Sequence, residues 1–191
     1  MDRSNGYEKV SAEFLAHRST RVGVNAVRKW ARLLPRGGTV IDLGCGPGFP
    51  MTEVLVAEGL NAFGIDAAPS LVQEFRRNLP NTPVACEAVQ DSRFFDRTFD
   101  AVLGWGLMFL LSAEDQHRLI QRIGGILVPG GRLLFTSPAA KLVWNDAMTG
   151  LQSRSLGAEE YRRQLLGVGV SISNEFEDEG QNHYFDAFKK G

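Results

Sequence analysis

The chain has 191 residues, the length of one domain with a substantial buried core. Hydrophobic residues make up 43% of it and charged residues 23%, which excludes disordered, collagen-like and coiled-coil chains. Lysine and arginine together number 21, against 22 for aspartate and glutamate, and the net charge is -1. Nucleic acid is therefore not an expected partner.

Cysteine content and hydropathy indicate the compartment. Two cysteines, Cys45 and Cys86, are too few for a disulfide framework, and neither stands at metal-ligand spacing from the other or from the three histidines. We therefore expect no metal and a reducing, cytoplasmic setting. The N-terminal residues are polar, and no apolar run approaches the roughly 20 residues that a membrane helix needs. The sequence predicts neither secretion nor a membrane span.

Periodic apolar residues divide the chain into strands that alternate with helices. In chain order we expect helices over 7–18 and up to residue 34, a strand over 39–43, a helix closed by Gly59, a strand over 62–66, a helix opened by Pro69, strands over 83–88 and 100–106, a helix capped by Ser112, a strand over 132–136, a helix over 158–166, and strands over 170–177 and 183–189. The polar stretch over 137–157 is expected to be an insert without regular structure.

This alternation predicts parallel strands joined by right-handed crossovers. The expected fold class is α/β: a three-layer α/β/α sandwich around a mostly parallel, seven-stranded sheet. The last strand is the exception, because the connection over 178–182 is too short for a crossover and makes that strand antiparallel to its predecessor. No linker or internal repeat divides the chain, so residues 1–191 are expected to form a single domain.

Glycines occupy every second position in the turn after the first predicted strand, at Gly44, Gly46 and Gly48. Such a turn lets a ligand approach the backbone without a Cβ in the way. Two ligand classes compete: a dinucleotide, with its pyrophosphate at the helix N-terminus, and an adenosyl cofactor without phosphate. The dinucleotide fingerprint G-x-G-x-x-G would require a glycine where the chain has Phe49. The spacing therefore favours the adenosyl cofactor.

The run from Val40 to Gly48 resembles motif I of the class I S-adenosylmethionine-dependent methyltransferases: two aliphatic residues, Asp, Leu or Val, and then Gly-x-Gly-x-Gly. Further features of that family follow in order along nearly the whole chain: the acid Asp66 after the second strand, the pair Glu87-Ala88 after the third, Phe99 to Val102 in the fourth, and Leu127 to Leu133 before the fifth. The resemblance implies a Rossmann-like methyltransferase fold.

The resemblance also implies a cofactor, S-adenosyl-L-methionine, with S-adenosyl-L-homocysteine as product. It assigns cofactor binding to Asp42, Gly44, Cys45, Gly46, Gly48, Phe49, Asp66, Ala67, Glu87, Ala88 and Trp105. Asp66 is expected to accept hydrogen bonds from the ribose hydroxyls, with helix capping as the alternative role. Glu87 is expected at the adenine amine, and a solvated loop acid is the alternative. Cys45 is expected to be buried and inert.

The residues after the fourth predicted strand bear on the methyl acceptor. Family members that methylate exocyclic amines of nucleic acids or glutamine carry Asp or Asn, two prolines and an aromatic residue there, whereas this chain has Gly104 to Leu107. A cysteine nucleophile and a cluster of metal-binding acids are also missing from that segment. By elimination, the resemblance points to a small-molecule acceptor.

Several other functions stay open at this stage. The alternatives are a non-catalytic S-adenosylmethionine-binding sensor or partner subunit, a methyltransferase acting on protein or RNA, a nicotinamide oxidoreductase, and an aminopropyltransferase on the same fold. The oxidoreductase is weakened by Phe49, and the aminopropyltransferase by the missing acidic pair after the fourth strand. The oligomeric state is not predicted.

Segments outside the repeated units are expected to cover the acceptor as a lid: the N-terminal helices over 7–34, with Phe14 and Arg18, and the insert over 137–157. The candidate acceptor-binding residues are Tyr7, Trp105, Trp144, Asn145, Asp146, His183 and Tyr184. His183 is the candidate general base, because its ordinary pKa suits proton removal near neutrality, and a plain surface histidine is the alternative.

Overall fold

The structure is a computed structural model, and it describes residues 3–191. The helices are α1 (Ser11–His17), α2 (Val24–Ala31), α3 (Met51–Ala57), α4 (Pro69–Asn78), α5 (Ala113–Ile126) and α6 (Ala158–Gly167), with 3₁₀ turns η1 (Phe94–Asp96) and η2 (Met108–Leu110). The strands are β1 (Thr39–Leu43), β2 (Asn61–Asp66), β3 (Val84–Cys86), β4 (Phe99–Gly104), β5 (Leu127–Thr136), β6 (Leu142–Asn145), β7 (Gln152–Ser155), β8 (Val170–Glu177) and β9 (His183–Lys189).

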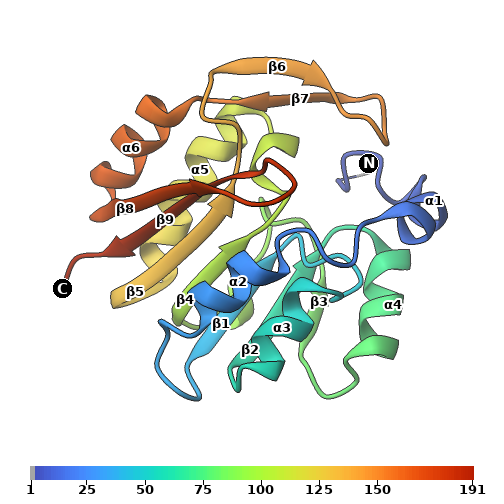
Figure 1. Cartoon of the computed structure of the whole chain (residues 1–191), viewed down its shortest axis with the longest axis horizontal. Coiled ribbons are helices and arrows are strands. Elements are labelled where there is room, and N and C mark those ends of the chain that lie inside the picture. Colours follow the sequence, from blue (N-terminus) through green and yellow to red (C-terminus); the bar gives the residue numbers. More distant parts are fainter. Residues whose placement is uncertain (1–2) are drawn as a thin grey trace.

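Seven strands form the central sheet in the order β3-β2-β1-β4-β5-β9-β8 (Figure 1). The first five are mutually parallel, and β9 runs antiparallel to both β5 and β8. The predicted α/β fold with its antiparallel last strand is therefore confirmed. Because the carboxyl ends of parallel strands meet at one edge of the sheet, the loops after β1, β2, β3 and β4 converge there.

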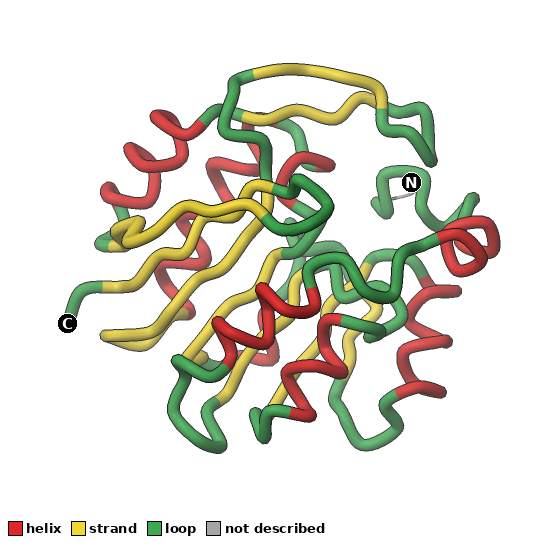
Figure 2. Tube along the Cα trace, viewed as in Figure 1, coloured by secondary structure: helices red, strands yellow, loops and turns green. Residues whose placement is uncertain are grey.

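Helices cover both faces of the sheet and make the three layers visible in Figure 2. The side chains of β1 alternate between these layers. Val40 packs in the cluster that α2 and α3 cover, with Trp30 and Leu55. Ile41 points to the opposite cluster, which contains the apolar residues of α5 and α6. A strand buried on both sides explains why its sequence reads as a nearly continuous apolar run.

The insert over 137–157 differs from the prediction, because it contains an antiparallel hairpin, β6 with β7. In Figure 1 this hairpin stands over the carboxyl edge of the sheet, and its tip reaches toward the N-terminal segment. No strand was predicted here because the hairpin has no buried apolar face: Val143 is 58% exposed, and Leu142 and Leu151 are also exposed. The buried side chains of β7, Ser153 and Ser155, are polar, so the strand shows no alternation of apolar and polar residues.

A buried polar network anchors the base of the hairpin to the helices behind the sheet. The Tyr161 hydroxyl donates to Gln116 Oε1 at 2.7 Å and lies 2.9 Å from Ser137 Oγ. Gln116 Nε2 in turn donates to the carbonyls of Leu111 and Arg154, each at 3.0 Å. Tyr161 and Gln116 are fully buried, so each polar atom of the network needs its partner.

We expect the Tyr161→Phe variant to lower the free energy of unfolding by about 1–2 kcal/mol, because the Gln116 side-chain oxygen loses its buried donor. Urea unfolding followed by circular dichroism measures the change. Gln116→Leu breaks the same bond from the other side, so the double variant should cost less than the sum of the single variants. Strictly additive costs would show that this bond does not couple α6 to α5.

Candidate functional site

A cavity of about 240 Å³ lies at the carboxyl edge of the sheet. Of the residues predicted from the sequence, its lining contains Tyr7, Asp42, Gly44, Cys45, Gly46, Phe49, Asp66, Ala67, Glu87, Ala88 and Trp105. The lining also draws on residues 3–18, on the turn η2 after β4, and on Thr136 and Asn182. The structure thus gathers the glycine turn and the acids after β2 and β3 around one space.

The Asp66 carboxylate connects the glycine turn to α4. Its Oδ2 accepts the Gly46 N–H and its Oδ1 accepts the Ala68 N–H, both at 2.8 Å. Burial raises the pKa of Asp66, and the two N–H donors oppose that rise. Each carboxylate oxygen has two lone pairs, so both oxygens retain capacity for ligand hydroxyls. The alternative role, capping of α4, is not made, because Asp66 accepts the N–H of the N-cap residue Ala68 and no side chain caps this helix. The ribose role stays a prediction.

Asp42 lies beneath the glycine turn and is almost fully buried, with 1% of its surface exposed. Thr52 Oγ1 donates to Asp42 Oδ2 at 2.6 Å. Burial raises the pKa of Asp42 to about 7, and the Thr52 bond and the Arg18 charge oppose this rise. The Asp42 carboxyl is thereby set to change charge near neutral pH.

Arg18 is a lining residue to which the sequence analysis gave no cofactor role. It follows α1, and its guanidinium lies over the Phe14 and Phe49 rings, at 5.4 and 5.9 Å from their centroids. Burial lowers the pKa of Arg18 to about 10, while the nearby Asp42 charge opposes the shift. No motif of fixed spacing covers the segment before motif I. The only signal for this site in the sequence is Phe14 followed four positions later by Arg18.

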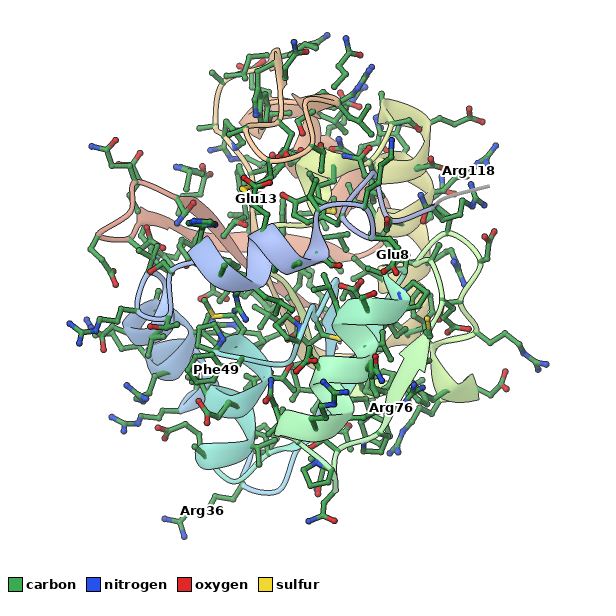
Figure 3. All side chains as sticks on the ribbon, turned by 90° about the vertical axis from the view of Figure 1, so that its right-hand side faces the viewer. Glu8, Glu13, Arg36, Phe49, Arg76 and Arg118 are labelled. Atoms are coloured by element: carbon green, nitrogen blue, oxygen red, sulfur yellow. The ribbon has the colours of Figure 1, made fainter. Side chains whose placement is uncertain are left out.

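Residues 3–18 form a roof over the cavity, and polar contacts hold this N-terminal roof to the core. Arg3 makes a bidentate ion pair with Asp91, with the shortest N–O distance 2.7 Å. Glu8 accepts from the Ser70 N–H at 2.9 Å and from the Ser70 hydroxyl at 2.7 Å. Figure 3 shows Glu8 beside the first turn of α4. The roof is therefore tied to the loop after β3 and to α4.

Asp146 ties the tip of the hairpin to the same roof. Its Oδ1 accepts the N–H groups of Met148 and Thr149, which closes the turn between β6 and β7. Its Oδ2 accepts the Tyr7 hydroxyl at 3.3 Å, and burial followed by the Asp146 charge raises the pKa of Tyr7. Asp146 itself is not among the residues that line the cavity. It joins the two segments that the sequence analysis expected as a lid.

Trp105 follows β4 and lines the cavity with a ring that is fixed from behind. Its indole N–H donates to the Tyr184 hydroxyl at 2.7 Å, and that hydroxyl donates to Asp178 at 2.8 Å. Tyr184 is fully buried and stacks on Phe176, with ring centroids 4.8 Å apart. Tyr184 therefore lies behind the cavity wall, where it orients Trp105.

Three further candidates lie away from the cavity. Trp144 packs against Phe109 with centroids 5.5 Å apart, and Asn145 is exposed. His183 corrects the expectation of a base beside the pocket, because its Nε2 lies 3.0 Å from Glu175 and its ring packs on Phe185. Neighbouring residues of a strand point to opposite faces, so His183 faces away from the side to which Tyr184 turns. His183 is not carried forward as a base.

The described residues were also compared with what a metal site and a membrane-spanning helix require. Over residues 3–191, no group of three or more histidine, cysteine, aspartate or glutamate side chains is arranged to hold a metal ion. In the same part of the chain, no helix has the length and apolar character needed to span a membrane. Both cysteines are free; Cys45 is buried under the glycine turn and Cys86 is exposed.

The model of the methyltransferase domain family matches residues 14–185, so the chain belongs to this family. The fold is that of the class I S-adenosylmethionine-dependent methyltransferases. The solved structure of CalS10, an amino pentose methyltransferase of Micromonospora echinaspora with S-adenosylmethionine bound, has a TM-score of 0.72 at 16% identity and covers 94% of this chain and 95% of its own. Membership implies S-adenosylmethionine as the methyl donor.

Two relatives illustrate the range of the family. Trans-aconitate 2-methyltransferase of Paracidovorax citrulli is 29% identical over 158 residues, which cover 70% of this chain and 58% of the relative. Ubiquinone biosynthesis O-methyltransferase of Xanthomonas axonopodis pv. citri is 31% identical over 151 residues, which cover 76% and 59%. The chain spans about half the length of the curated relatives it matches.

We expect Gly46→Ala and Gly48→Ala to separate ligand binding from folding. Both glycines have positive φ, +54° and +75°, so both substitutions strain the backbone. A Cβ on Gly46 would meet only Phe14, at 3.9 Å, whereas one on Gly48 would lie 2.7 Å from the Phe75 ring. Calorimetry should show roughly tenfold or more weaker S-adenosylhomocysteine binding for Gly46→Ala. Thermal and urea unfolding should show the larger stability loss, about 2 kcal/mol or more, for Gly48→Ala. The reverse pattern would contradict this division.

The raised pKa of Asp42 predicts a pH-dependent stability of the unliganded protein. Between the ordinary carboxyl pKa and about 7, the folded state keeps a proton that the unfolded state has lost, so this group lowers stability as pH rises. Asp42→Asn removes the effect. The variant should gain roughly 2–3 kcal/mol of unfolding free energy relative to the wild type between pH 5 and pH 8, measured by urea unfolding. If the unfolding free energies of the variant and the wild type differ by the same amount at pH 5 and at pH 8, Asp42 has an ordinary pKa.

Proposed function

We propose that this methyltransferase transfers a methyl group from S-adenosylmethionine to a small-molecule acceptor held beneath its N-terminal roof. The observation that carries the proposal is the shape of the site. The glycine turn of β1 and Trp105 at the end of β4 line the same cavity of about 240 Å³, and the chain's own residues 3–18 cover it. A space covered by the chain's own residues favours a small acceptor over a folded macromolecule.

The lining residues fit an adenosyl cofactor with an amino-acid end. The backbone of Gly46 faces open space, so a ligand can approach it closely. The Asp66 carboxylate beside it would accept the ribose hydroxyls. Glu87 lines the same cavity after β3 and would take the adenine amine. Arg18 and Asp42 carry opposite charges and lie near each other. Arg18 would bind the cofactor carboxylate, and Asp42 would bind the cofactor ammonium group.

S-adenosylmethionine supplies a methyl group made electrophilic by the sulfonium. The acceptor would gain this methyl group, S-adenosylhomocysteine would leave with the electron pair of the former carbon–sulfur bond, and the acceptor proton would pass to water. The chain's own part is to align the acceptor and to exclude bulk water. The residues of 3–191 that line the cavity include no histidine, so we propose catalysis by positioning, without a dedicated imidazole base.

The two free thiols support our proposal of a reducing, cytoplasmic setting, since Cys86 is exposed and unpaired with Cys45.

A sensor that binds the cofactor without turnover is the second candidate function, because the same residues would bind the cofactor in either case. The two functions differ in turnover.

The experiment that tests the function is transfer of isotopically labelled methyl from S-adenosylmethionine into a fractionated cell extract, alongside calorimetry of S-adenosylhomocysteine binding. Label in the small-molecule fraction supports the proposal and allows mass spectrometry to identify the acceptor. Label confined to protein or RNA would overturn the small-molecule acceptor. Tight binding with no label in any fraction would favour the sensor.

We expect Asp66→Ala to weaken S-adenosylhomocysteine binding by roughly 1.5–3 kcal/mol, because a charged hydrogen-bond acceptor is lost from the cavity. Isothermal titration calorimetry measures the change, and a melting curve separates it from loss of the Gly46 and Ala68 bonds. Asp96→Ala is the matched control, since Asp96 is an exposed aspartate outside the cavity lining. An unchanged dissociation constant in Asp66→Ala would remove Asp66 from the site.

A further inference from the structure

Aromatic rings from several segments line the cavity. Trp105 is fixed by its bond to Tyr184. Phe109 packs on Trp144 of the hairpin, and Tyr7 meets Phe14 edge to face at 5.4 Å. Leu107 and Leu110 add further apolar lining. Trp105 and Phe109 are each supported by a residue outside the roof, and such an apolar wall suits a flat apolar ligand.

The charges around the cavity disfavour an anionic acceptor. Its described lining contains two cations, and each of them faces a carboxylate. Arg3 is paired with Asp91 by both of its carboxylate oxygens, and Arg18 lies beside Asp42. An acceptor with several carboxylates or a phosphate would find no uncommitted cation in this lining, and it would be repelled by the acids already there.

One polar group in the lining has no partner. The Asn5 side-chain nitrogen is buried and donates no hydrogen bond in the structure. Asn5 lines the cavity from the N-terminal roof, between Arg3, which pairs with Asp91, and Tyr7, which donates to Asp146. A buried donor without an acceptor is costly, and an oxygen of a ligand in the cavity would satisfy it.

Taken together, these contacts identify the acceptor by its chemistry. We infer that the acceptor is an uncharged aromatic compound with an oxygen substituent, of the phenol or hydroquinone class, and that the Asn5 amide donates a hydrogen bond to that oxygen. This inference rests on the proposed function and names the substrate class for the same site. The apolar walls bind the ring, Asn5 selects for an oxygen on it, and the paired arginines leave no place for a polyanion.

The test uses the full chain saturated with S-adenosylhomocysteine and two probes, methylhydroquinone and trans-aconitate, titrated by calorimetry. Methylhydroquinone should bind roughly tenfold or more tightly than trans-aconitate. Asn5→Leu should weaken methylhydroquinone binding by about three- to tenfold while leaving S-adenosylhomocysteine affinity unchanged. Asn145→Leu is the matched control, because Asn145 is exposed on the hairpin and outside the lining. It should change neither affinity.

A second variant guards against a folding defect in the roof. Asn5→Gly removes the donor and suits the positive φ of residue 5, so it should weaken methylhydroquinone binding as Asn5→Leu does, without strain in the backbone. Equal or tighter binding of trans-aconitate would overturn the inference. So would a loss of S-adenosylhomocysteine affinity in both Asn5 variants, since Asn5 would then serve the cofactor. Failure of the wild type to bind S-adenosylhomocysteine would overturn the proposed function itself, whereas S-adenosylhomocysteine binding without methylhydroquinone binding would overturn only the acceptor class.

Discussion

Two backbone N–H groups converge on the Asp66 carboxylate, one from the glycine turn after β1 and one from the start of α4. Asp66 ends β2, and the register that pairs Leu43 with Ile65 brings the end of β2 beside the end of β1. A slip of one residue in that pairing would turn the carboxylate to the other face of the sheet. The geometry of the ligand turn is therefore an outcome of strand register, which the apolar core on both faces enforces.

The N-terminal roof depends on a different kind of interaction. Its ion pair between Arg3 and Asp91 is largely exposed, with side-chain exposures of 46% and 61%. Such pairs contribute on the order of 0–1 kcal/mol. The Tyr7 bond to Asp146, at 3.3 Å, is long for a hydroxyl donor. These two ties are individually weaker than the continuous pairing of the sheet strands, and the bonds of Glu8 to Ser70 add a further link between the roof and α4.

This contrast explains what could be predicted from the sequence. The sheet, the glycine turn and the Ser112 helix cap follow from local patterns, and Ser112 does accept the Asp115 N–H. The hairpin β6–β7 could not be predicted, because the buried residues of β7 are serines and the apolar residues Leu142 and Val143 of β6 are exposed. To place His183, one must know which residues of β9 point to which face of the sheet. A shift of one residue in the strand assignment reverses that answer.

The proposed ligand contacts of Arg18 and Asn5 could not be predicted from the sequence for a further reason. The cofactor side of the cavity is built by contiguous motifs, since backbone geometry at a strand end dictates which residues fit there. The rest of the lining is assembled from distant segments: Asn5 in the roof, Trp105 after β4 and Asn182 before β9. No local spacing links such residues, and only the folded chain brings them together. Because these segments lie outside the glycine turn, their side chains can change without disturbing the Asp66 contacts. On the proposed assignment, a change at Asn5 alters the acceptor contacts and keeps the Asp66 bonds, whereas a change at Arg18, in the same roof, alters the cofactor contacts.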